Sequence, residues 1–384
     1  MRLLHLADLH LGWEPTGWPA DRAAERRRRR DDVLGRAVDV ALTEGAQLVV
    51  IAGDLFDDFD PPPEVAEAAL AELRRLERGG VLPVTVPGNF DELTYGGSVY
   101  RRHRGDWPGV LVTDPLPAHV ASLDLAGERL HLYGAAYTGG VTPTDIPLRE
   151  FPRLEEPGVH VAAFHGTLGA AATRRTLPLD GDALAAARYH YVALGHLHEP
   201  LRHEFPAGPA VYPGAPEALA FGDGGCGTLT LVDLEGERAV AREVPVEVQP
   251  VRDAVLDLTP VDDVTEVDAA IAELADAEAV QRVRLGGSLW LPELDVETMR
   301  QRHAGAFFHL EVVDEVEGLA PELLARWAEE ASVRGAFVAR MLARLEGAGG
   351  EERRRLALSL RWGIAALYGG PSPRAAPARP ERAP

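Results

Sequence analysis

The 384-residue sequence has no lysine, one asparagine, one cysteine and no long hydrophobic run. A single cysteine, Cys226, excludes an intrachain disulfide and fits a reducing compartment; we expect it to be a small core residue on an apolar strand. Asp8 and His10 interrupt the N-terminal apolar stretch, and no run approaches the roughly 18 apolar residues of a membrane span. The sequence therefore predicts a soluble, cytoplasmic protein that has no membrane partner.

Positive charge is also scarce. All 39 basic residues are arginines, and they face 60 acidic residues, which gives a formal net charge of −21. DNA affinity comes largely from cationic contacts that release counterions, so this balance excludes a protein whose whole surface coats nucleic acid. Any contact with nucleic acid must be local, assisted by metal ions or shared with a partner.

The chain is longer than a typical domain of about 150 residues, which favours two or three domains. Six short apolar runs, rich in residues that favour strands, alternate with helical patterns such as the one over Pro63–Gly79, and this alternation predicts a layered α/β domain. The runs are "RLLHLAD", "AQLVVIAGD", "LPVTVPGN", "RLHLYGAAY", "VHVAAFHG" and "YHYVALGH". We assign this domain to residues 1–249.

The pattern changes near Pro250. Residues 250–318 read as strand, helix, strand, helix, strand and predict a smaller α/β capping domain. Residues 319–369 are expected to form two helices, over Leu323–Leu345 and Glu351–Tyr368. The apolar faces of these helices either cover the second domain or dock onto a partner protein. Residues 370–384 are rich in proline, alanine and arginine and are expected to be disordered.

Polar side chains follow the apolar strands of the first domain where each strand ends. Each fragment alone is more often a satisfied core residue or a chance match than a ligand. Five such fragments in one chain point to a site at the carboxyl edge of a sheet, where ligands of α/β proteins bind. The fragments supply Asp8 and His10, Asp54, Asn89, His165, and His196 and His198.

Imidazoles, carboxylates and an amide oxygen suit divalent ions such as Mn²⁺, Fe²⁺ or Zn²⁺, and the fragments contain no thiolate. Seven candidate ligands exceed the needs of one tetrahedral ion, and a carboxylate can bridge. Two ions about 3.5–4 Å apart are therefore expected, of a kind that clamps a phosphate and lowers the pKa of a bridging water. We favour Mn²⁺, with Fe²⁺ or Zn²⁺ as alternatives.

These motifs resemble those of the calcineurin-like metallophosphoesterase superfamily. "HLADLHLG", "GDLFD", "PGNFDE", "ALGHLH" and "YPGAPEALAFGD" are similar to the SbcD-type nuclease subunits of bacterial DNA double-strand-break repair, over roughly Met1–Pro250. The resemblance implies an α/β/β/α sandwich of four layers. It implies that one ion is held by Asp8, His10 and His198, and that the other is held by Asn89, His165 and His196, with Asp54 bridging. Asp57 is either a carboxylate that orients a ligand or a solvated loop acid.

The sequence departs from that pattern at Phe90. In the family a histidine normally stands there, paired with the following aspartate, here Asp91, and it stabilises the transition state or protonates the leaving oxygen. A phenyl ring can do neither, so this contribution, typically about 10²–10⁴-fold, should be missing or come from another group such as His103 or His203. The resemblance implies a metal-competent phosphodiesterase or DNA nuclease that is weakened by Phe90.

Two arginine clusters are candidates for DNA contact. The first, "ERRRRRDD" at Glu25–Asp32, is either a solvated helix start or a phosphate-binding surface. The second, "YRRHRGDW", includes Arg101, Arg102 and Arg104 and two aromatic residues. The resemblance implies a homodimer that acts on DNA ends and binds an SbcC-type SMC-like ATPase through the C-terminal helices. A small-molecule phosphoesterase, or a non-catalytic scaffold for DNA ends and the ATPase, are the alternatives.

Overall fold

The computed structural model describes residues 1–125, 127–139, 146–169, 176–259, 261, 263–290, 294–316 and 318–367. The chain divides into two compact units, Met1–Gln249 and Pro250–Pro384. All six strands expected in the first unit are present, and helix α2 (Pro63–Arg78) lies within the helical pattern expected over Pro63–Gly79. The further division at residue 318 stays a prediction, and the predicted disordered tail, residues 370–384, lies outside the described residues.

The first sheet of the first unit has the strand order β14-β13-β1-β2-β3-β4. Strands β1 to β4 run parallel, while β13 runs antiparallel to β1 and to β14. The carboxyl ends of the parallel strands therefore meet at one edge. The bounds are β1 Arg2–Leu6, β2 Leu48–Ala52, β3 Leu82–Val86, β4 Val110–Leu111, β13 Thr228–Glu235 and β14 Arg238–Pro245.

The second sheet has the order β11-β12-β10-β7-β6-β5. Its four central strands are parallel, and β5 and β11 close the two sides as antiparallel strands. The bounds are β5 Ala118–Leu125, β6 Glu128–Ala135, β7 Val159–His165, β10 Tyr191–Gly195, β11 Leu201–Glu204 and β12 Pro209–Tyr212. Two short strands, β8 (Thr167–Leu168) and β9 (Pro178–Leu179), pair with each other outside this sheet.

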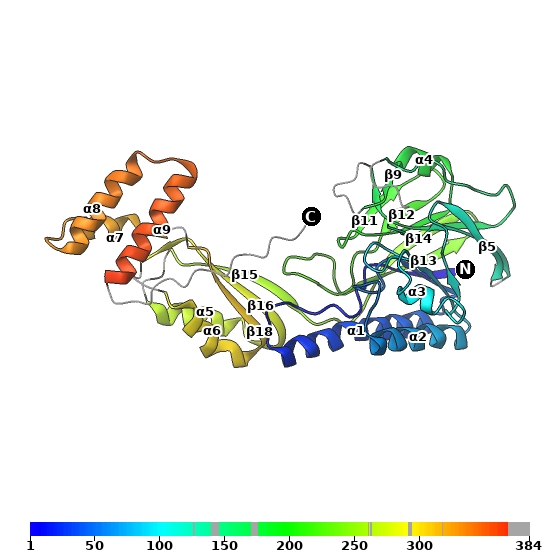
Figure 1. Ribbon diagram of the computed structural model, residues 1–384, viewed down its shortest axis with the longest axis horizontal. Helices are drawn as coiled ribbons and strands as arrows, with labels where there is room; N and C mark the ends of the chain where they lie inside the picture. The colour runs from blue at the N-terminus through cyan, green and yellow to red at the C-terminus, as the bar shows by residue number, and fades with distance from the viewer. Residues whose placement is uncertain are drawn as a thin grey trace. The chain divides into compact units, whose positions relative to one another are not determined.

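The two sheets pack face to face, and helices cover their outer faces. Alternate residues of β7 show this: Val161 belongs to the core shared with the first sheet, whereas Phe164 belongs to a second core that includes Leu184. Leu184 lies on α4 (Gly181–Ala186), while α1 (Ala20–Thr43) and α2 pack side by side on the first sheet (Figure 1). The expected α/β/β/α sandwich is confirmed, with an outer layer on the second sheet that contains only one short helix among the described residues.

The second unit begins with the expected strand, helix, strand, helix, strand series. Three parallel strands form a sheet in the order β15-β16-β18, as crossover helices between strands require. The bounds are β15 Val251–Asp257, α5 Val264–Glu273, β16 Asp276–Gly286, α6 Val296–His303, η1 Ala304–Ala306 and β18 Phe307–Asp314. Two further short strands, β17 (Ser288–Leu289) and β19 (Gly318–Leu319), pair beside this sheet.

The C-terminal segment differs from the expected two helices. The pattern over Leu323–Leu345 forms two helices, α7 (Pro321–Ala328) and α8 (Val333–Glu346), followed by α9 (Gly350–Leu367). The break occurs because the Ser332 side chain accepts a hydrogen bond from the amide of Gly335 and so starts a new helix. Leu323, Val338 and Leu360 belong to one core with the sheet of the second unit, so these helices do cover the second domain.

Two expectations from composition can be compared with the structure. Cys226 is partly exposed and precedes β13 by two residues, so its placement on a core strand was wrong. None of the helices in the described part of the chain is both long enough and apolar enough to cross a membrane.

Candidate metal centre

The polar residues that follow β1 and β2 lie on two loops that hydrogen-bond to each other. The amide of Asp8 donates to the carbonyl of Gly53 at 3.1 Å, and the amide of His10 donates to the carbonyl of Asp54 at 3.0 Å. Asp8, His10 and Asp54 have positive φ angles of 56°, 48° and 50°. This region is uncommon for residues that carry a Cβ, and strained residues cluster at functional sites. The loops thus hold three candidate ligands in one strained pair of turns.

Two glycines of the motifs allow the loops to approach the ligand side chains. A Cβ on Gly53 would lie 2.1 Å from Nδ1 of His165, and a Cβ on Gly88 would lie 2.2 Å from Oδ1 of Asp54. Both distances are far shorter than any real contact. The glycines before Asp54 and Asn89 are therefore required by close packing around the site.

The first predicted ligand set, Asp8, His10 and His198, converges. One candidate ligand atom from each residue lies within 4.8 Å of the others. The His10 Nδ1 atom is 3.1 Å from Oδ1 of Asp57, and its Nε2 atom is buried, has no hydrogen-bond partner and lies 3.7 Å from Oδ2 of Asp54. Asp57 thus fixes the tautomer in which the Nε2 lone pair faces the carboxylates. A buried nitrogen left in this way fits a metal ligand.

The second predicted set also converges. Oδ1 of Asn89 lies 2.9 Å from Nε2 of His165 and 3.0 Å from Nδ1 of His196, and Oδ2 of Asp54 lies 3.2 Å from Nε2 of His165. Two ligands at right angles around an ion, each about 2.1 Å from it, are separated by about 3.0 Å. The spacing of these atoms is therefore that of neighbouring ligands in one coordination sphere. Asp54 also groups with Asp8 and His165.

The electrostatics of the cluster are those of paired buried ions. Asp8 and Asp54 are no more than 1% exposed. Burial raises the pKa of Asp8, whereas at Asp54 the opposing charge and hydrogen bond of His165 outweigh burial and hold the pKa below its usual value. Burial likewise opposes the charging of His165, but Asp54 prevails and raises its pKa to about 9. Buried carboxylates of this kind need a cation, which is a proton on imidazole here and a metal ion when one is bound.

Thr176 is a contact that sequence reasoning missed. Its hydroxyl is hydrogen-bonded to Nε2 of His196, so Nδ1 is the nitrogen that faces Asn89. The main-chain amide of His196 donates to both carboxylate oxygens of Asp8, each at 3.0 Å. Burial and the nearby His165 lower the pKa of His196 to about 4, so its ring is neutral at pH 7. Thr176 lies in no motif, and the sequence carried no signal for it.

Phe90 and Asp91 lie beside this cluster in different surroundings. The ring of Phe90 is 43% exposed and meets the ring of His10 edge-on, with centroids 4.8 Å apart, and its amide donates to Asp54. Asp91 is fully buried and accepts hydrogen bonds from the amides of Gly88 and Phe56 and from the hydroxyl of Tyr100. Asp91 therefore ties the loops after β2 and β3 together.

The two histidines considered as substitutes for a residue-90 histidine have other neighbours. Nδ1 of His103 lies 3.5 Å from a carboxylate oxygen of Asp106 just after α3 (Val99–Arg102), and the ring of His203 packs edge-on against Tyr212. His203 belongs to β11, an edge strand of the second sheet.

The second arginine cluster is exposed only in part. Arg101, Arg102 and Arg104 are exposed; Arg101 donates to the carbonyl of Leu93, and Arg102 pairs with Asp60. The two aromatic residues that accompany them are buried: Tyr100 bonds to Asp91, and Trp107 donates to the hydroxyl of Thr85. Because they are buried, Tyr100 and Trp107 are not available to stack on bases, and only the arginines remain candidates for DNA contact.

The first arginine cluster lies on α1. Arg26 and Arg30 are buried, while Arg28 and Arg29 both bond to Glu25 and Arg27 pairs with Glu14. These contacts favour a structural role over phosphate binding, because the charges are already matched within the chain.

The sequence of the first unit is similar to that of a known protein family. A model of calcineurin-like phosphoesterases matches residues 1–200. The chain is 29% identical over 248 residues, 58% of this chain and 50% of the relative, to the DNA double-strand break repair protein Mre11 of Methanopyrus kandleri. It is 29% identical over 279 residues, 64% of this chain and 69% of the relative, to the SbcD component of the nuclease SbcCD from Bacillus subtilis. The chain thus spans half the length of the first relative.

A solved structure of a dimetal phosphatase from Danio rerio is also similar, with a TM-score of 0.40 and 14% identity. That similarity covers 64% of this chain and 97% of the phosphatase chain.

Proposed function

Because the chain belongs to the calcineurin-like phosphoesterase family, we propose that its first unit is a dimetal phosphodiesterase and that its substrate is DNA. The observation that carries the chemistry is the convergence of candidate ligands from five strand ends: Asp8 belongs to one group with His10 and His198 and to another with Asp54 and His165, and Asn89 contacts His165 and His196. The names of the two curated relatives, a double-strand-break repair protein and a nuclease component, support DNA as the substrate.

In this proposal Asp8, His10 and His198 hold one ion, Asn89, His165 and His196 hold the other, and Asp54 bridges them. When bound, two divalent ions would supply a nucleophilic hydroxide at neutral pH and would neutralise charge on the phosphate. Side chains of the protein orient the imidazoles: Asp57 orients that of His10, and Thr176 orients that of His196. Mn²⁺ is the ion we would test first.

We expect the activity of this chain to be weak. The exposed ring of Phe90 is at the edge of the ligand cluster, against His10, and it carries no proton to donate to a leaving oxygen. Phe90 also favours a second candidate function, a metal-binding scaffold for DNA ends that does not cut them. The two functions differ in turnover, and both predict metal binding.

The test is Mn²⁺-dependent cleavage of end-labelled double-stranded and single-stranded DNA and of a chromogenic phosphodiester, by this chain and by Phe90→His. We expect Phe90→His to cut DNA about 10²-fold faster, because general-acid catalysis is typically worth 10²–10⁴-fold. A gain of less than about tenfold would contradict the role given to residue 90. Hydrolysis of the chromogenic ester without DNA cleavage by either form would favour a small-molecule phosphoesterase, and no hydrolysis at all would favour the scaffold.

DNA contact is proposed for Arg101, Arg102 and Arg104. When all three are replaced by alanine, the logarithm of DNA affinity should fall less steeply with the logarithm of salt concentration. The change in slope should correspond to the loss of up to about three phosphate contacts. The matched control is the pair Arg28→Ala and Arg29→Ala, since those side chains are neutralised by Glu25. An unchanged slope in the triple variant would remove the cluster from the DNA surface.

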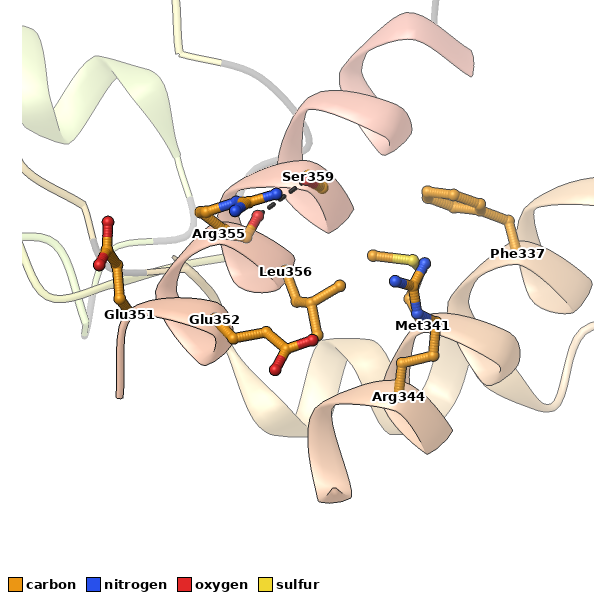
Figure 2. Close-up of a pocket in the computed structure, with 8 residues that line it drawn as sticks. All are labelled: Phe337, Met341, Arg344, Glu351, Glu352, Arg355, Leu356 and Ser359. Atoms are coloured by element: carbon orange, nitrogen blue, oxygen red, sulfur yellow. Dashed lines mark hydrogen bonds between the residues drawn. The ribbon is translucent and has the colours of Figure 1, made fainter. Parts of the chain in front are cut away.

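We further propose that the C-terminal helices bind an SbcC-type SMC-like ATPase and that the protein acts as a homodimer. A pocket of about 540 Å³ lies between α8 and α9, where Phe337 and Met341 face Leu356 (Figure 2). Its lining also includes four charged residues, Arg344, Glu351, Glu352 and Arg355. Leu358 and Trp362 do not line this pocket, but they lie on α9 and are 42% and 38% exposed. Exposed apolar side chains on a helix that also borders a pocket support a docking face for a partner helix.

The double variant Leu358→Glu and Trp362→Ala should not co-purify with the ATPase, because it removes the apolar side chains proposed to contact the partner. Both side chains are exposed, so the core of the second unit should stay intact. Val333→Glu is the matched control, because Val333 is 76% exposed and lies at the start of α8. Normal complex formation by the double variant would exclude this face.

A further inference from the structure

The loop that carries Asp8 and His10 is held from a second direction, by helix α1. The guanidinium of Arg30 donates one hydrogen bond to the carbonyl of His10 at 3.2 Å and another to the carbonyl of Leu9 at 3.1 Å. The next residue, Asp31, accepts a hydrogen bond from the amide of Gly12 at 2.9 Å. Two consecutive helical residues thus bind three main-chain groups around a candidate ligand.

Arg30 is enclosed at this position. Its side chain is 1% exposed, its guanidinium carbon lies 5.0 Å from the centroid of the Trp13 ring, and its Nε atom is buried without a partner. Burial and the nearby Arg26 lower the pKa of Arg30 only to about 10, so the side chain is charged at pH 7. Burying a charged side chain with one unsatisfied donor costs free energy of folding. The two hydrogen bonds from Arg30 to main-chain carbonyls offset part of that cost.

Those contacts act where the backbone is strained. Asp8 and His10 have left-handed φ angles, and neither is a glycine. On one side this conformation is fixed by hydrogen bonds to Gly53 and Asp54. On the other side the only charged group that reaches the carbonyls of residues 9 and 10 among the described contacts is Arg30. A planar guanidinium can reach two successive carbonyls at once, which an ammonium group does less well.

We propose that Arg30 is a positioning residue of the metal centre, which fixes the main chain of Leu9–His10 so that His10 presents its Nε2 atom to the ion shared with Asp8 and His198. This inference rests on the proposed function only in requiring that the site bind metal. Arg30 touches neither substrate nor ion. Outer-shell contacts of this kind typically change metal affinity about 10–100-fold.

Arg26 provides a matched control one turn earlier on α1. It is 2% exposed and makes three side-chain hydrogen bonds, to Glu217, Gln249 and the carbonyl of Ala218. None of these belongs to the ligand loops. Loss of Arg26 and loss of Arg30 should therefore both destabilise the fold, while only the loss of Arg30 should disturb the first ion.

The experiment is Mn²⁺ titration of the full chain, by calorimetry and by electron paramagnetic resonance of free Mn²⁺, for the unmodified protein, Arg30→Gln, Arg30→Lys and Arg26→Gln. We expect Arg30→Gln to weaken one of two Mn²⁺ sites about 10-fold or more and to leave the other unchanged. Arg30→Lys should recover part of this loss, and Arg26→Gln should bind both ions normally.

Normal binding of both ions by Arg30→Gln, or an equal loss in Arg26→Gln, would overturn the inference. Should Arg30→Gln fail to fold, Arg30→Lys decides, and unchanged affinity in that variant would overturn it. If the unmodified chain binds no Mn²⁺, the proposed metal centre fails and this inference falls with it. Normal Mn²⁺ binding without DNA cleavage would remove only the proposed substrate.

Discussion

Histidines gather at both ends of the second sheet, but those at the carboxyl end lie among candidate metal ligands. At the carboxyl end, His165 ends β7 and His196 follows β10. Toward the amino end, His160 lies near the start of β7, His131 lies beside it on β6, and His190 directly precedes β10. The rings of His131 and His160 stack with centroids 4.6 Å apart, slightly closer than the 5.2 Å between His165 and His196. Proximity of imidazoles therefore does not identify a site.

The difference is in what the ring nitrogens contact. His131 and His160 each use Nδ1 with a hydroxyl, of Ser122 or Tyr133, and Nε2 with a main-chain carbonyl. Both nitrogens are satisfied by neutral groups. Burial, with the charge of Arg153, lowers the pKa of His160 to about 4.

At the carboxyl end the contacts are different: Nε2 of His165 lies near a carboxylate oxygen of Asp54, and Nδ1 of His196 lies near the amide oxygen of Asn89. On the loop after β1, in the first sheet, His10 keeps Nε2 without a hydrogen-bond partner near Asp54, and Asp54 raises the pKa of His165 to about 9. His5, in the middle of β1, shows that an unpartnered nitrogen is not enough: its Nε2 is also free, but burial lowers its pKa to about 3. The candidate ligand histidines differ from His5 in that a ring nitrogen of each contacts or approaches an oxygen of Asp54 or Asn89.

The strongest test of this comparison removes one group from the candidate metal centre and one from the amino end of the second sheet. Asp54→Asn should reduce Mn²⁺-dependent phosphodiester hydrolysis by at least about 10³-fold, because several kcal/mol of charge stabilisation depend on the ions. His160→Gln should lower stability and leave turnover of the folded fraction unchanged. Both variants are assayed in the Phe90→His background so that activity is measurable. Equal losses of activity at both ends would refute the distinction.

The pH dependence of Mn²⁺ affinity is a second test of the difference between the two groups of histidines. His165 has its pKa raised to about 9, so at pH 7 it holds a proton that metal must displace. Affinity should therefore rise with pH, by about tenfold per unit below pH 9, or about 100-fold between pH 6.5 and 8.5. Calorimetry in buffers of different ionisation enthalpy would count the released proton. His160→Phe should keep the same slope, and a flat profile would contradict the protonated state of His165.

The stability of the folded protein at acid pH should depend on His160, toward the amino end of the second sheet. His160 has its pKa lowered to about 4, so it is neutral in the folded protein and charged in the unfolded chain between pH 4 and pH 6.5. The unfolded state then binds more protons, and stability present above pH 6.5 is lost as the pH falls through that window. The melting temperature of the metal-free protein should fall accordingly. His160→Phe should flatten this fall; a fall of the same steepness would assign acid sensitivity elsewhere.

The smallest expected effect concerns one hydroxyl. Tyr133 donates to Nδ1 of His160 and accepts from the amide of Leu154. Tyr133→Phe should cost about 1–2 kcal/mol in urea unfolding, because a buried acceptor and donor lose their partner. Mn²⁺ affinity should not change. A drop in that affinity would mean that the two ends of the sheet are coupled.

Much of the first unit could be predicted from local sequence. Strand-forming runs that end in Asp, Asn or His have a period and a composition that can be recognised, and the parallel arrangement brings their ends together. Helix α8 could also have been separated from α7, since Ser332 followed by a helical pattern is a capping signal. Burial of Tyr100 and Trp107 could not, because their partners, Asp91 and Thr85, lie 9 and 22 residues away in the chain.

By itself, the sequence determined the strands, their order along the chain and the chemical types of the side chains at their ends, because these depend on residues close in the chain. Tertiary structure decided which of the histidines face carboxylates, that Arg30 holds the loop of His10, and that Asp91 binds main chain. These properties depend on contacts between residues far apart in the sequence, and on the loss of water around them. Burial changes the pKa and the hydrogen bonding of a side chain without changing its identity.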